Sequence, residues 1–132
     1  MRSIPATTGD LLLSWVFLRS GSHLMRDPKR AAEIAAPLLE PIRTVIPGAT
    51  PSVVVGINAT VQLAASVLLA IGCNRRLAAL TLAASLIPTT IAGHAFWRLT
   101  DPSQRALQRI HFDKNLAILG GLMLAALEVE PR

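Results

Sequence analysis

The sequence is poor in aromatic residues and in cysteine. It has no tyrosine, two tryptophans, three phenylalanines and one cysteine among 132 residues. A single cysteine excludes an intrachain disulfide and a CxxC redox pair. Charged residues make up 16% of the chain, whereas hydrophobic residues make up 52%. This composition predicts helices that pack closely through small side chains rather than a soluble domain filled with aromatic rings.

Two uncharged runs dominate the sequence, Ser52 to Gly72 and Leu77 to Trp97, and each has 21 residues. A helix rises about 1.5 Å per residue, so either run can cross the roughly 30 Å hydrocarbon core of a bilayer. Only Cys73 to Arg76 separate the runs. We therefore predict an antiparallel membrane hairpin, and hence an integral membrane protein.

Two further apolar segments flank this hairpin. The first begins near Thr8, has Asp10 in a helix cap at its start and contains Arg19. The last has Asp113 and Lys114 in its first turn. Backbone polar groups in lipid must be satisfied within a helix. The sequence thus predicts an all-α fold: a single transmembrane domain, 1–132, formed by an antiparallel four-helix bundle with helices at about 8–25, 52–72, 77–97 and 110–127.

The two longer connections have different compositions. Residues 27–51 contain five prolines between short apolar stretches, which indicates short amphipathic pieces lying at the membrane interface after the first helix. The second connection is polar, and Asp101 followed by Pro102 marks a helix start. Both connections should lie on the same side of the bilayer, opposite the loop from Cys73 to Arg76.

Basic residues exceed acidic ones by 13 to 8, which gives a net charge of +5. Basic residues commonly flank membrane helices, where they contact anionic lipid headgroups. No nucleic-acid-binding motif accompanies the charge. Membrane lipids are therefore the predicted partners, and nucleic acid is not.

Polar residues within the apolar runs follow a helical spacing. Asn58, Gln62 and Ser66 recur every four residues, so they share one helix face and should point into the bundle. Ala117, Gly121 and Ala125 form a similar stripe of small residues on the last helix, which permits close approach of a neighbour.

The predicted topology gathers all three histidines on one side of the membrane. The candidate polar site at these helix ends comprises Arg19, His23, His94, Arg98, His111, Asp113, Lys114 and Asn115. Arg19 either pairs with Asp113 or extends to the lipid headgroups. The histidines lack HxxxH or HxxE spacing, so no metal site is predicted. A structural hydrogen-bond network, or a quinone or lipid headgroup held by these donors, remains open; catalytic residues cannot be assigned.

The stretch from Pro88 to Gly121 resembles the signature region of the DoxX family in its actinobacterial form. The matching motifs are Pro88-Thr-Thr-Ile-Ala-Gly-His-Ala-Phe-Trp97, Asp101-Pro102, Gln108, and His111-Phe-Asp-Lys-Asn-Leu followed by Gly120-Gly121. Asp113 falls at a variable position of the last motif. The resemblance implies a multi-pass protein of the cell inner (plasma) membrane.

Some members of that family are small subunits of thiosulfate:quinone oxidoreductase. Others are membrane partners of superoxide dismutase and a thiosulfate sulfurtransferase in mycobacterial oxidative-stress defence. The resemblance therefore implies a small membrane subunit or scaffold of a redox complex, more an accessory protein than an enzyme, with a soluble oxidoreductase as partner. A quinone is the cofactor that such a role would involve. Alternatives are a quinone-binding oxidoreductase subunit with its own site, and a non-redox protein that handles lipids or small molecules or assists assembly. A homo-oligomer is left open.

Overall fold

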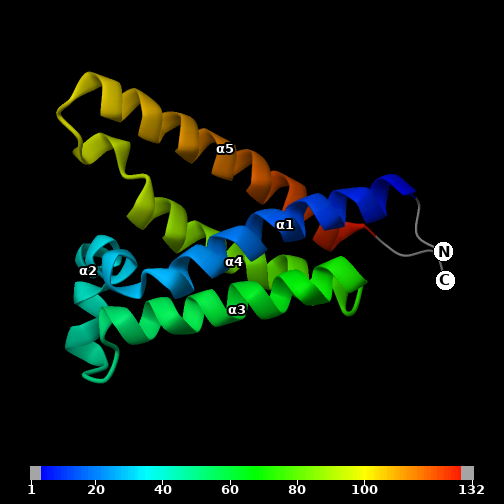
Figure 1. Cartoon of the computed structure of the whole chain (residues 1–132), viewed down its shortest axis with the longest axis horizontal. Coiled ribbons are helices and arrows are strands. Elements are labelled where there is room, and N and C mark those ends of the chain that lie inside the picture. The colour runs from blue at the N-terminus through cyan, green and yellow to red at the C-terminus, as the bar shows by residue number, and fades with distance from the viewer. Residues whose placement is uncertain (1–3, 129–132) are drawn as a thin grey trace.

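The structure, a computed structural model, describes residues 4–128. Over that range all of its secondary structure is helical (Figure 1). Its elements are α1 (Ile4–Arg26), α2 (Pro28–Val45), α3 (Pro51–Ile71), α4 (Arg75–Gly93), the 3-10 turn η1 (Phe96–Arg98) and α5 (Pro102–Leu127). The all-α prediction is confirmed. The described part of the chain has five α-helices, however, rather than four.

Three helices begin at a capping residue followed by proline. The side chains of Asp27, Thr50 and Asp101 each accept a hydrogen bond from the backbone amide three residues further on. Proline is favourable at the next position, because the amide there has no partner within the helix. The helix start predicted at Asp101 and Pro102 is thus confirmed, and it belongs to α5 itself, which begins at Pro102 instead of near residue 110. Its first two turns are polar, so apolar length alone did not reveal them.

The proline-rich connection is one continuous helix rather than several short pieces. α2 includes both Pro37 and Pro41 in its interior. These prolines are four residues apart and both are exposed, so their rings share the outer face of the helix. The opposite face buries Ala32 and Leu39 against the bundle. Burial of this apolar face holds the helix together although each proline removes a backbone hydrogen bond.

The other helices pack side by side: α1 along α3, α3 on α4, α4 on α5, and α5 back on α1. Their core contains Phe17, Leu69, Leu82 and Leu122, surrounded by alanines. α2 lies across one end, packed on α3 and α4. We call this the histidine end; it contains the helix termini at Arg26, Pro51, Gly93 and Pro102. The opposite, hairpin end contains the α3–α4 turn, the start of α1 and the end of α5 (Figure 1).

α1 and α3 approach each other closely at Gly21. A Cβ atom at this position would lie 2.9 Å from Leu63 Cγ and 3.2 Å from the carbonyl oxygen of Ala59. Both separations are shorter than an ordinary van der Waals contact. The absence of a side chain at Gly21 therefore sets the distance between the two helices.

Three helical segments are long and apolar enough to cross a membrane, namely 51–71, 75–98 and 102–127. They correspond to the second, third and fourth predicted spans. α1 is long enough but is not apolar enough over the described residues, because polar side chains such as Asp10, Ser14 and Arg19 lower its mean hydropathy. Large apolar side chains such as Ile57 and Leu124 cover the outer faces of the helices. These exposed apolar faces are suited to contact with lipid.

We expect the substitution Gly21→Val to destabilise the protein, because its side chain would force α1 away from α3. Overpacking of this kind costs roughly 1–3 kcal/mol. Gly56→Val is the matched control, since a Cβ at Gly56 meets nothing within 4 Å. Denaturation of the detergent-solubilised variants, followed by tryptophan fluorescence, should show a lower midpoint for Gly21→Val. Equal midpoints for the two variants would contradict the close approach.

Candidate functional site

A cavity of about 420 Å³ lies at the histidine end, between α1, α2, α3 and α4. Most of its wall is apolar and includes Leu24, Ile34 and Val54. Its polar lining consists of His23, Asp27, Arg30, Asn58, Thr89 and His94. The size and the mixture of apolar wall with few polar groups are typical of a small-molecule site.

His94 is held in place from two sides. Its ring stacks on that of His111, with the ring centroids 5.2 Å apart and the planes 21° apart. Its Nδ1 lies 2.7 Å from Gln108 Oε1. Because an amide oxygen can only accept, the Nδ1–H of His94 donates this hydrogen bond. Residues of α5 therefore orient an imidazole that lines the cavity.

A chain of hydrogen bonds leads from the cavity wall into the protein interior. Thr89 Oγ1 accepts from Asn58 Nδ2 at 3.3 Å, and Asn58 Oδ1 accepts from Ser85 Oγ at 2.6 Å. Ser85 Oγ in turn accepts from Gln62 Nε2 at 2.9 Å. Gln62 is fully buried, and its Oε1 has no partner among the described residues. We call these four side chains the polar ladder.

The polar ladder includes two members of the predicted interior stripe. The third member, Ser66, is fully buried and its hydroxyl donates to the carbonyl oxygen of Gln62 within α3. Gln62 and Ser66 lie wholly inside the protein, whereas Asn58 is half-buried and reaches the cavity. All three residues therefore lie on the inward face of α3, as their spacing of four residues predicted.

The eight predicted site residues divide into three groups. His23 and His94 line the cavity. His111 and Asn115 lie between α4 and α5, where Asn115 Nδ2 donates to Thr90 Oγ1 at 2.9 Å. The remaining four are exposed on the outer surface; they are Arg19, Arg98, Asp113 and Lys114. The helices therefore bring only part of the predicted set together.

The expected ion pair between Arg19 and Asp113 does not form within the described chain, residues 4–128. Successive residues of a helix are rotated by about 100°, so Arg19 lies opposite Asp10, which is buried. Asp113 lies on the exposed face of α5. Both side chains therefore point away from the protein interior.

No cluster of three or more histidine, cysteine, aspartate or glutamate side chains within residues 4–128 could hold a metal ion. His94 and His111 form only the stacked pair described above. Next to it, the rings of Phe96, Trp97 and Phe112 meet edge to face, with centroids 5.2 to 5.9 Å apart. Arg109 lies 5.8 Å above the Phe96 ring. This aromatic cluster suits a membrane–water interface.

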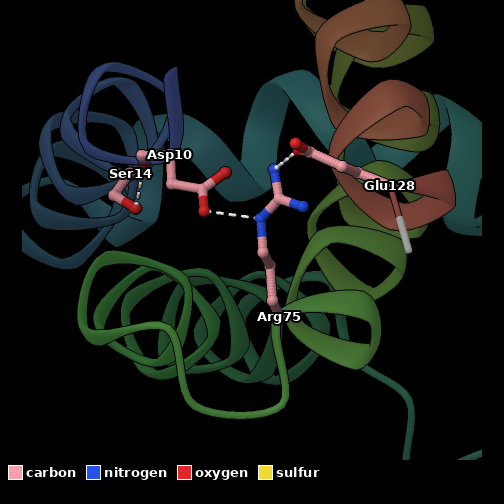
Figure 2. Close-up of polar contacts among 4 residues, drawn as sticks. All are labelled: Asp10, Ser14, Arg75 and Glu128. Atoms are coloured by element: carbon pink, nitrogen blue, oxygen red, sulfur yellow. Dashed lines mark hydrogen bonds and ion pairs between the residues drawn. The ribbon is translucent and has the colours of Figure 1, made fainter. Parts of the chain in front are cut away.

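The sequence did not reveal a buried ion network at the hairpin end (Figure 2). Arg75 Nε lies 2.6 Å from Asp10 Oδ2, and Arg75 Nη2 lies 2.7 Å from Glu128 Oε2. Arg75 and Asp10 are both more than nine-tenths buried, whereas Glu128 is half exposed. Ser14 donates to the backbone carbonyl of Asp10 at 2.7 Å. The guanidinium thus joins the start of α1, the start of α4 and the end of α5.

The sequence carried one signal for this network. Asp10 lies two turns inside α1, so it is an ionisable group within an apolar helix rather than part of a cap. Such a group usually needs a partner. Arg75 is the first residue of α4, at the same end of the molecule. Because residues 73–76 were interpreted as a loop, Arg75 was not predicted to pair with Asp10.

A comparison with protein families gives a match to DoxX over residues 9–95, which covers most of α1 and all of α2, α3 and α4. The match includes the cavity lining and stops before His111. No curated protein and no solved structure matches the chain.

The ion network yields a stability prediction. Arg75→Met should remove the guanidinium that pairs with the buried carboxylate of Asp10, and loss of one member of a buried ion pair costs roughly 3–5 kcal/mol. Arg76→Met is the matched control, because Arg76 is exposed and surface changes stay within about 0.5 kcal/mol. Thermal unfolding in detergent, followed by circular dichroism, measures both. Equal stability of the two variants would show that the network contributes nothing.

Proposed function

Because the chain belongs to the DoxX family of membrane proteins, we propose that it is a small membrane subunit of a redox complex whose cavity receives a quinone headgroup. The observation that carries this proposal is the cavity itself, an apolar space with a few polar groups on its wall. A quinone has the matching chemistry: a flat apolar ring with two carbonyl oxygens that accept hydrogen bonds.

The chain offers several donors to such a ring. Asn58 gives one N–H to Thr89, which leaves the second N–H of its amide for a ligand. His23 lines the cavity from α1, and Arg30 lines it from α2. The polar ladder fixes the Asn58 side chain from behind, so the donor is oriented before the ligand arrives. This arrangement supports binding of a carbonyl oxygen at the α3 wall.

In this proposal four helices cross the inner membrane, with α1 as the fourth. α1 has 23 residues, enough for about 34 Å, and it packs along α3. α2 then lies in the interface at the histidine end, beside the aromatic cluster of Phe96, Trp97 and Phe112. The cavity would open at headgroup depth, where a quinone headgroup can enter from the membrane.

The role assigned to the chain is that of an accessory subunit rather than an enzyme. With one cysteine, the sequence offers no dithiol, and it carries no recognisable nucleotide-binding motif. Electrons would therefore come from a partner, a soluble oxidoreductase docked at the membrane surface. The cavity would hold the quinone within reach of that partner.

A second candidate function is the handling of a lipid. Asp27 and Arg30 line the same cavity with opposite charges. Such a pair fits a zwitterionic headgroup, while the apolar wall fits an acyl chain. The two candidates differ in whether a quinone or a phospholipid competes for the site.

Purified protein in nanodiscs should bind a short-chain quinone saturably, as seen by quenching of tryptophan fluorescence. His23→Phe and Asn58→Leu should each weaken binding about tenfold, the effect of one lost hydrogen bond. Thr60→Val is the control, since Thr60 is exposed on α3 and bonds only to its own helix. Quenching that never saturates, or equal affinity in all variants, would refute the quinone site. Displacement by a lysophospholipid but not by a second quinone would favour lipid handling.

The complex itself can be tested by isolation. A tagged chain solubilised in mild detergent should co-purify with an oxidoreductase that contains a flavin or a metal, identified by its absorption spectrum and by mass spectrometry. Recovery of a defined complex that has no redox-active component would contradict the accessory role.

A further inference from the structure

Two ionisable side chains are exposed at membrane depth on neighbouring helices. Arg19 lies seven residues before the end of α1, or about 10 Å inside the histidine end. Asp113 lies on α5, inside the apolar segment 102–127. Both are exposed and neither forms an ion pair within residues 4–128. Ionisable groups at such depth almost always face a protein neighbour or a cavity.

The surfaces around these two residues have complementary shapes. Beside Arg19, the outer face of α1 carries the exposed ring of Trp15 and the exposed Leu12. The outer face of α5 carries small residues next to Asp113, namely Ala117 and Gly120. A Cβ at Gly120 would meet nothing within 4 Å, so this part of α5 is open. α1 therefore presents a protruding ring and α5 a shallow surface.

The two faces also match in register. Leu13 of α1 and Gly121 of α5 define a common level, because a Cβ at Gly121 would lie 3.3 Å from Leu13 Cδ2. Towards the histidine end, Arg19 lies about 9 Å and Asp113 about 12 Å from this level. Trp15 lies about 3 Å above it, within the range of Ala117 and Gly120 at about 2–6 Å. Each α1 feature thus has its α5 counterpart at nearly the same depth.

We propose that a second copy of this chain packs on the joint outer face of α1 and α5. The two copies are related by a two-fold axis along the membrane normal. Arg19 of each copy then pairs with Asp113 of the other, and each Trp15 packs over Ala117 and Gly120 of the other. A two-fold axis makes every contact twice and preserves depth, so one chain supplies both complementary faces.

The partner on this face is a second copy of the chain, because each chain carries both halves of the contact at nearly the same depth. Asp113 of a second copy offers a carboxylate within about 3 Å of the level of Arg19, and the two-fold axis supplies this match of charge twice. Within one chain, α1 and α5 separate towards the histidine end (Figure 1), which keeps the two outer faces from meeting each other. This inference does not depend on the proposed quinone site.

Reversal of single charges tests the contact. Cys73 is exposed at the hairpin end and is the sole cysteine, so it can carry a donor or an acceptor dye. Energy transfer between labelled copies in liposomes should be strong for the native protein. Arg19→Asp leaves acidic groups at both positions and Asp113→Arg leaves basic groups at both. Each variant alone should associate at least about tenfold more weakly, because like charges meet in both contacts.

The mixture of the two variants is the decisive sample. An equal mixture of Arg19→Asp and Asp113→Arg places opposite charges in both contacts, so energy transfer between the two variants should return. Lys29→Asp is the control, an exposed charge on α2 whose reversal should change nothing. Loss of association in both variants without recovery in the mixture would overturn the pairing. Absence of energy transfer in the native protein would overturn the dimer.

A steric variant tests the shape of the contact independently of charge. Gly120→Leu should abolish energy transfer by filling the surface that receives Trp15, while the fold remains intact because Gly120 is exposed and a Cβ there meets nothing within 4 Å. Gly56→Leu is its matched control, at another glycine with open space. Equal energy transfer in these two variants would exclude α5 from the interface.

Discussion

The charge of Arg75 shared between two carboxylates is the constraint that organises the molecule. It closes the hairpin end by joining α1, α4 and α5, helices that do not all touch one another extensively elsewhere. A guanidinium in a poorly solvated position is stable only with such partners. With one end fixed, α5 can separate from α1 at the other end (Figure 1). The cavity occupies this less tightly held histidine end, covered by α2.

Hydrogen bonding gives the cavity a rigid wall. Asn58 and Thr89 at its surface are tied to Ser85 and Gln62 in the interior, so side chains join α3 and α4 over about one helical turn. His94 is fixed similarly by Gln108 and His111 of α5. The groups available to a ligand are thus oriented by residues that the ligand does not touch.

The course of the long apolar helices could be predicted from the sequence, but the rotation of each helix about its axis only in part. The uncharged runs gave the spans of α3 and α4, and the spacing of Asn58, Gln62 and Ser66 gave their inward face. The same depth argument placed Arg19 near Asp113, yet both face outward, because packing at Gly21 and Leu13 sets how α1 is turned. The pairing of Asp10 with Arg75 depends on the same rotation. Hydropathy also missed the capped, polar start of α5 at Pro102.

The two prolines on the outer face of α2 restrict where that helix can lie. Pro37 has no amide to donate to the carbonyl oxygen of Glu33, and Pro41 has none for that of Pro37. Each carbonyl oxygen needs a donor from outside the helix, and hydrocarbon supplies none. This requirement favours the interfacial position proposed for α2, because water there can supply the missing donors. In that position α2 would cover the cavity at the polar surface of the bilayer, with water on the outer face of the helix.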